Sequence, residues 1–192
     1  MKFDIILAGV GGQGVLSVSA IIASSAMHEG LSVKQSEVHA MSQRGGEVQA
    51  NLRLSDRPIA SDLIPRATAS LVLSMEPLES LRYLPYLSET GTVLTATDPV
   101  TNFANYPEME GLLAQIRALP HAILIDAERL ARQAGSARAT NMVMVGAASH
   151  LLPLKLETIE HFVRTLFEAK GARVVETNLK ALAAGRAAAS NR

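Results

Sequence analysis

The chain has 192 residues, 48% of them apolar, which is enough for one domain whose core needs no disulfide or metal. Lysine plus arginine and aspartate plus glutamate number 18 each, so charge gives no reason to expect a nucleic acid or a membrane surface as partner. The absence of cysteine excludes a disulfide framework, a thiolate nucleophile and a cysteine-bound iron–sulfur cluster on this chain.

The apolar run near the N-terminus, residues 3–8, is too short for a signal peptide and ends in glycines. No other apolar run approaches the ~20 residues that a membrane-spanning helix needs. We therefore expect a cytoplasmic chain that forms a single domain over residues 1–192.

Apolar runs separated by glycine and proline divide the chain into alternating strands and helices. Strands are predicted at residues 3–8, 31–35, 48–54, 69–73, 92–96 and 122–125. Helices are predicted at residues 15–30, 76–87, 127–134, 141–152, 156–170 and 178–189. Residues 36–46 have no clean period and are predicted to form a long loop.

The first strand, its glycine turn, the first helix and the second strand form a βαβ unit, and such crossovers imply parallel pairing. Residues 48–54 alternate apolar and polar side chains, which indicates a strand with one solvent-exposed face at a sheet edge. The predicted fold class is α/β: one open, doubly wound, mostly parallel, Rossmann-like sheet with an edge strand or hairpin and a helical C-terminal third.

Residues 9–14, Gly-Val-Gly-Gly-Gln-Gly, match the G-x-G-x-x-G pattern in the required place, after a strand and at a helix start. Glycines let backbone N–H groups approach an anion, and the helix N-terminus adds about half a positive charge. The turn is therefore a candidate site for a phosphate or pyrophosphate. The alternative is a turn used only for close packing of strand and helix.

A dinucleotide site needs more than this turn. An acidic residue should end the second strand to bind the ribose hydroxyls. The nearest carboxylate here, Glu37, already lies in the predicted loop. This gap counts against an NAD site.

The predicted loop leaves the second strand at the carboxyl edge of the sheet, beside the glycine turn, where ligands of such folds bind. Arg44 is a permanent cation with a planar set of donors, and Gly45 and Gly46 free the backbone beside it. Long loops in compact domains are usually functional. The alternative is a surface loop whose glycines only turn the chain into the next strand.

Three segments in order resemble the gamma-type domain of 2-oxoacid:ferredoxin oxidoreductases: residues 9–15, residues 42–46 (Ser-Gln-Arg-Gly-Gly) and residues 141–147 (Asn-Met-Val-Met-Val-Gly-Ala). The sequence of residues 37–46 is most similar to that of the small (beta) subunit of indolepyruvate ferredoxin oxidoreductases. It lacks the Pro-x-Tyr-Gly-type stretch that relatives acting on pyruvate or 2-oxoglutarate tend to have. The resemblance extends from Phe3 to Gly185.

Enzymes of this family decarboxylate a 2-oxoacid on thiamine diphosphate, pass electrons through iron–sulfur clusters to ferredoxin and transfer the acyl group to coenzyme A. The resemblance implies that this chain holds none of these cofactors firmly, is inactive alone and packs against a larger subunit that carries thiamine diphosphate and iron–sulfur clusters. The residues that we expect to face this interface, near the coenzyme A phosphates, are Gly9, Gly11, Gly12, Gln13, Gly14, Ser42, Gln43, Arg44, Gly45 and Gly46. The further partner contacts that we expect are Glu37, His39, Met41 and Asn141.

No histidine spacing indicates a metal site. His39 is a candidate acid–base group, and the alternative is a solvated loop histidine without a function. Glu76, Asp98 and Asp126 follow predicted strands and could reach a ligand or cap helices. Two other functions stay open, a free-standing NAD(P)-dependent oxidoreductase and a nucleotide-binding or assembly module.

Overall fold

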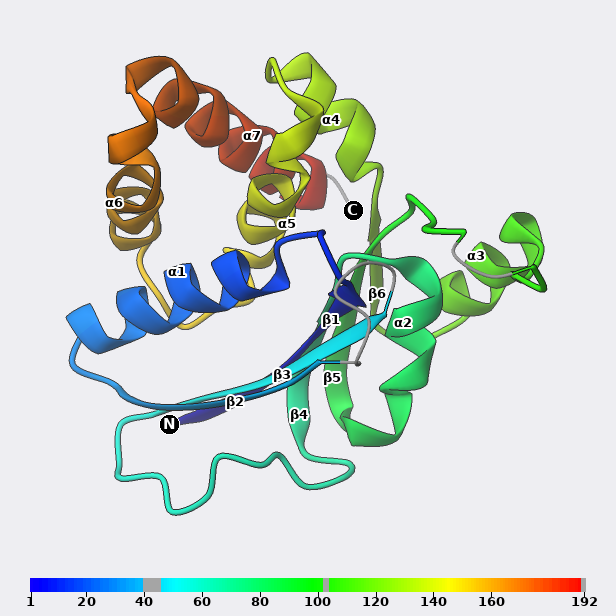
Figure 1. Cartoon of the computed structure of the whole chain (residues 1–192). Coiled ribbons are helices and arrows are strands. Elements are labelled where there is room, and N and C mark those ends of the chain that lie inside the picture. Colours follow the sequence, from blue (N-terminus) through cyan, green and yellow to red (C-terminus); the bar gives the residue numbers. More distant parts are fainter. Residues whose placement is uncertain (40–45, 102–103, 191–192) are drawn as a thin grey trace.

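A computed structural model describes residues 1–39, 46–101 and 104–190 of the chain (Figure 1). Its centre is a six-stranded sheet with the order β2-β3-β1-β4-β5-β6. The strands are β1 (Lys2–Val10), β2 (Ser32–His39), β3 (Glu47–Ser55), β4 (Ala69–Ser74), β5 (Leu87–Ala96) and β6 (Ala122–Ile125). Neighbours among β1, β4, β5 and β6 pair in parallel, whereas β3 is antiparallel to both β1 and β2. The predicted α/β class and mostly parallel sheet are confirmed.

Helices cover both faces of the sheet. They are α1 (Val15–His28), α2 (Pro77–Arg82), α3 (Met109–Arg117), α4 (Ala127–Gln133), α5 (Thr140–Ala148), α6 (Leu156–Phe167) and α7 (Ala172–Ser190). Short 3-10 turns are η1 (Leu84–Tyr86), η2 (Ala137–Ala139) and η3 (Glu168–Lys170). Alternate residues of β1 point to opposite faces, so Ile5 and Leu7 join a core under α1 and α4–α7, while Ile6 and Ala8 join a smaller core under α2 and α3.

The sheet differs from the prediction in where the antiparallel strand lies. Residues 48–54 are not at the edge, because β3 is inserted between β1 and β2, and β2 forms the edge. The first two strands therefore do not pair with each other, although both run in the same direction. The predicted hairpin is present, formed by β2 and β3 in antiparallel register from Ser32↔Ser55 to His39↔Val48.

The polar face of β3, which suggested an edge, is covered by the segment 56–68 that follows it. Asn51 is 4% and Arg53 8% exposed. Their side chains bond to the backbone of that segment: Ile64 N–H donates to Asn51 Oδ1, and Arg53 Nη1 donates to the carbonyl oxygens of Ser61 and Leu63. Alternating polarity here reflects a buried polar layer and not contact with solvent.

Further differences concern the limits of elements and one additional helix. Residues 36–39, predicted as loop, continue β2, because the register with β3 extends to His39. Helix α3 was not predicted, since only Leu112 and Ile116 of its nine residues are buried and the apolar pattern is thin. The predicted helices after residue 122 are present, with α7 beginning six residues earlier, at Ala172 and not at Asn178.

Helices α5 and α7 cross with their backbones in contact. A Cβ atom at Gly146 would lie 1.9 Å from the carbonyl oxygen of Leu182, and one at Gly185 would lie 1.9 Å from that of Val143. Residues 141–148 of α5 are all buried. In the described part of the chain, no helix has the length and apolar character needed to cross a bilayer.

Candidate functional site

The glycine turn and the end of the 36–46 segment meet at one rim of the sheet. Strand β1 pairs with β3 up to Val10↔Glu47, and the Gly11 N–H then donates to the Gly46 carbonyl at 2.9 Å. The carboxyl ends of β1 and β2 both reach this rim, because the two strands run in the same direction. The structure therefore brings Gly11 of the first segment and Gly46 of the second together.

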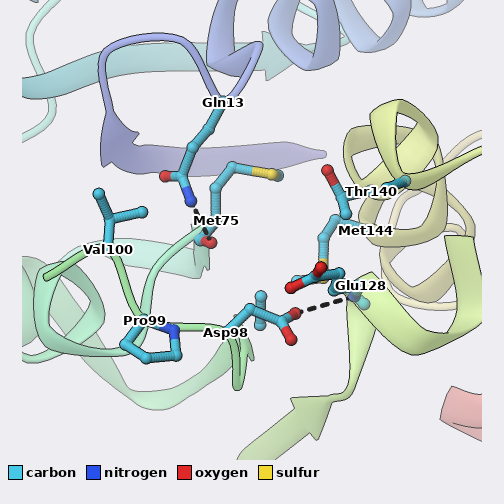
Figure 2. Close-up of a pocket in the computed structure, with 11 residues that line it drawn as sticks. Gln13, Met75, Asp98, Pro99, Val100, Glu128, Thr140 and Met144 are labelled. Carbon is cyan, nitrogen blue, oxygen red and sulfur yellow. Dashed lines mark hydrogen bonds between the residues drawn. The ribbon is translucent and has the colours of Figure 1, made fainter. Parts of the chain in front are cut away.

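Gln13 closes the turn onto the neighbouring strand. The Val10 N–H donates to Gln13 Oε1 at 2.8 Å, and Gln13 Nε2 donates to the carbonyl of Met75, just after β4, at 3.0 Å (Figure 2). Chain connections leave β1 and β4 toward opposite faces, so the gap between their ends is the switch point at which dinucleotides bind in related folds. The Gln13 side chain spans that gap, and the NAD(P) reading is not favoured.

The other glycines of the turn serve both close packing and backbone geometry. A Cβ atom at Gly9 would lie 2.9 Å from side-chain atoms of Val15 and Gln13, so any side chain there would force its neighbours to shift. Gly12 and Gly14 adopt positive φ of 102° and 79°, a region that other residues rarely enter. Gly14 is the N-cap of α1 without a side-chain cap, and Asn141 of α5 packs against it.

A cavity of about 230 Å³ lies beside Gln13 at the same rim. Figure 2 shows Met75, Asp98, Glu128 and Met144 around it, from four different segments. Asp98 Oδ2 accepts a hydrogen bond from the Glu128 N–H at 2.9 Å. Burial raises the pKa of the Asp98 carboxyl, and this hydrogen bond opposes the rise.

The three carboxylates that follow strands have structural partners. Glu76 accepts from the Glu79 N–H at the start of α2, and Asp126 accepts from the Arg129 N–H at the start of α4. Glu76 is 1% exposed and also accepts from the Tyr106 hydroxyl. These carboxylates thus accept hydrogen bonds from N–H groups at helix starts, in agreement with the helix-capping interpretation of the sequence.

Of the remaining predicted site residues, the structure describes Glu37, His39 and Asn141. Glu37 is an exposed residue of the edge strand β2, where it accepts a hydrogen bond from Gln35, and His39 ends the strand opposite Val48. Asn141 is 9% exposed. The predictions at Met41, Ser42, Gln43, Arg44 and Gly45 lie outside the described residues.

Replacing Gln13 by alanine should lower the free energy of unfolding by about 1–3 kcal/mol, because the Val10 N–H and the Met75 carbonyl lose a partly buried partner. Urea denaturation measures this. The control is Gln35→Ala on the exposed edge strand, where the change should stay within ~0.5 kcal/mol. Equal effects of the two substitutions would contradict a structural role for Gln13.

The comparisons with known proteins decide the family. The family model described as pyruvate ferredoxin/flavodoxin oxidoreductase matches residues 4–188. The chain belongs to this family. It is 37% identical to the indolepyruvate oxidoreductase subunit IorB of Archaeoglobus fulgidus, over 96% of this chain and 94% of the relative. It is 34% identical to the subunit of the same name from Methanothermobacter thermautotrophicus, over 99% of both chains.

Solved structures of the family have the same fold. The keto/oxoacid ferredoxin oxidoreductase gamma subunit of Geobacter sulfurreducens aligns over 100% of this chain and 98% of its own, with a TM-score of 0.74 at 22% identity. A 2-oxoglutarate:ferredoxin oxidoreductase of Magnetococcus marinus aligns with a TM-score of 0.79 at 22% identity. This chain spans 31% of the length of that protein, so the same fold also occurs as one part of a longer chain.

Proposed function

We propose that the chain is the small subunit of a thiamine-diphosphate-dependent 2-oxoacid ferredoxin oxidoreductase, with indolepyruvate or a related arylpyruvate as substrate. The observation that carries this proposal is the 37% identity, over nearly the whole of both chains, to an indolepyruvate oxidoreductase subunit. The holoenzyme would convert the 2-oxoacid to an acyl-CoA and pass the electrons to ferredoxin.

The residues of this chain define which part of that chemistry it can serve. Without cysteine it cannot ligate an iron–sulfur cluster, so a larger partner would hold the clusters together with thiamine diphosphate. Coenzyme A, when bound, supplies the thiol that accepts the acyl group. The glycine turn at the N-terminus of α1 fits one phosphate of coenzyme A. The Gln13 side chain is bonded to the Met75 carbonyl, between the ends of β1 and β4, and no side chain caps this helix, so its first N–H groups can meet a phosphate.

We further propose that the rim formed by Gly11, Gln13 and Gly46 faces the partner subunit. The support is geometric: two segments distant in sequence join here through the Gly11–Gly46 hydrogen bond, beside the edge strand β2. Glu37 and His39 lie on β2 beside this rim, Met41 and Arg44 follow them in the sequence, and all four would extend the contact. Asn141 is mostly covered by the chain itself and would act from beneath the turn.

The test is assembly of the holoenzyme. The tagged chain, co-expressed with the reading frames beside its gene, should co-purify with a large cysteine-rich subunit that contains iron and thiamine diphosphate. The complex should reduce ferredoxin with indolepyruvate and coenzyme A, and the isolated chain should not. Absence of such a partner, together with ribose-dependent NAD(P) binding by the chain alone, would overturn the proposal.

Arg44→Ala should impair assembly or turnover of that complex while leaving the unfolding free energy within ~0.5 kcal/mol, because the sequence predicts a surface loop at this position. Arg57→Ala is the matched control, since Arg57 is exposed just after β3, at the opposite rim of the sheet. Normal ferredoxin reduction by the Arg44→Ala complex would exclude this rim as the interface.

A further inference from the structure

A second and larger hollow, of about 480 Å³, lies among the helices on the α1 side of the sheet. It is lined by the first turns of three helices, with Ser17 from α1, Asn141 from α5 and Arg173 from α7. Arg138 of η2 and Lys170 of η3 complete its charged border. The volume suits a small molecule and is within the usual range for ligand sites.

The charges of this hollow are all of one sign. Arg138, Lys170 and Arg173 line it, and its lining contains no aspartate or glutamate. Within the described residues, none of the three forms an ion pair, whereas Arg129, Arg132 and Lys180 on neighbouring helices each pair with a carboxylate. Three like charges around one space repel one another unless an anion lies between them.

The helix termini add to the same field. Helices α2, α3, α4 and α6 each carry a glutamate in the first turn, namely Glu79, Glu110, Glu128 and Glu157. Helices α1, α5 and α7 carry no acidic residue there, and α1 and α5 also lack a side-chain cap. The three helices without acidic first turns are the three whose first turns line the hollow. The dipoles of these three helices, with no acidic side chain to compensate them, favour a bound anion.

One mostly buried amide, that of Asn141, lies in the lining of the same space and beside Gly14. The side chain of Asn141 is 9% exposed, and its Oδ1 accepts from the Met142 N–H at 3.0 Å, which fixes the orientation of the amide. Its Nδ2 then has no acceptor within the described residues. Among these residues the only fully enclosed side-chain polar atom without a partner is Ser19 Oγ, so Asn141 Nδ2 is not fully enclosed, and Asn141 is one of the residues that line the hollow.

We propose that this hollow is a binding site for the phosphate or pyrophosphate group of a small phosphorylated ligand. Arginine offers the two-pronged donor geometry that phosphate oxygens accept, and Lys170 adds a point charge. Asn141 adds a neutral amide donor to the lining, and the α5 and α7 N-termini add backbone N–H groups. The inference does not depend on the proposed function, since it concerns this chain alone.

Titration of the isolated full-length chain with inorganic pyrophosphate tests the site, followed by calorimetry and by amide chemical shifts. Pyrophosphate should bind and shift the amides of Thr140 and Arg173, and the double variant Arg138→Gln/Arg173→Gln should bind about tenfold more weakly or worse. Both arginines are exposed, so the variant should fold. The matched control, Arg117→Gln/Arg164→Gln, removes two exposed cations outside the hollow and should keep the affinity.

Absence of binding, or an equal loss of affinity in the two double variants, would overturn the proposal. ADP as a second probe separates the sources of the phosphate. Tighter binding of ADP than of pyrophosphate would support a nucleotide-bearing ligand, and equal binding would support a site for the free anion.

Discussion

Gly146→Ala is expected to lower the free energy of unfolding by about 3 kcal/mol or more, and Gly185→Ala should have a similar effect. In each case the new methyl group would lie 1.9 Å from a backbone carbonyl oxygen of the facing helix. Backbone atoms cannot move aside as a flexible side chain can, so α5 and α7 would have to separate and open the core between them. Urea denaturation of the isolated chain measures the loss.

The control for this prediction is the same substitution at an open helical position. A Cβ atom at Gly111 of α3 would meet only the Glu108 carboxylate, at 3.6 Å. Gly111→Ala should therefore stabilise the chain by about 0.5–1 kcal/mol, the difference in helix propensity. The close-contact explanation would be wrong if Gly146→Ala were tolerated as well as Gly111→Ala.

Arg53→Met is expected to cost about 3–5 kcal/mol of unfolding free energy, because it leaves the Asp4 carboxylate buried without its main partner. The Arg53 guanidinium holds Asp4 through two hydrogen bonds of 3.0 and 3.1 Å, and the two side chains are only 10% and 1% exposed. Lys2 lies 3.0 Å from Asp4, but it is 54% exposed and compensates little. Thermal and urea unfolding both report the change.

Two comparisons make this prediction specific. Arg129→Met breaks the exposed pair with Asp126, where the side chains are 57% and 47% exposed, and should cost no more than ~1 kcal/mol. The double variant Asp4→Leu/Arg53→Met buries no lone charge and should be more stable than Arg53→Met alone. A double variant as unstable as the single one would show that the loss came from detaching residues 61 and 63, to whose carbonyls Arg53 also donates.

The sequence predicts most of the elements because their local signals agree. Buried strands such as β6 are continuous apolar runs between breaks, and α4 ends before Gly135, whose φ is +113°. The strand order is not local information. The insertion of β3 between β1 and β2 depends on pairing between distant segments, and the polar pattern of β3 was misleading because residues 56–68 cover it.

For the candidate site, the glycine turn and its neighbour at Gly46 follow from motif and topology. The role of Gln13 does not, since Met75 is distant in sequence and only the fold brings its carbonyl within 3.0 Å. The same holds for Arg138, Lys170 and Arg173, which lie in separate segments with no common motif. The missing acidic residues in the first turns of α1, α5 and α7 are visible in the sequence, but their meaning depends on the convergence of those turns.

The inserted β3 separates the parallel part of the sheet from the edge strand β2. The chain leaves the sheet at His39 and re-enters it at Glu47, and both positions belong to the outermost pair of strands. Eight paired positions fix that hairpin independently of its tip. Insertions or substitutions between His39 and Glu47 can thus change that edge of the chain, while β1, β4, β5 and β6 keep their alignment and the glycine turn keeps its shape.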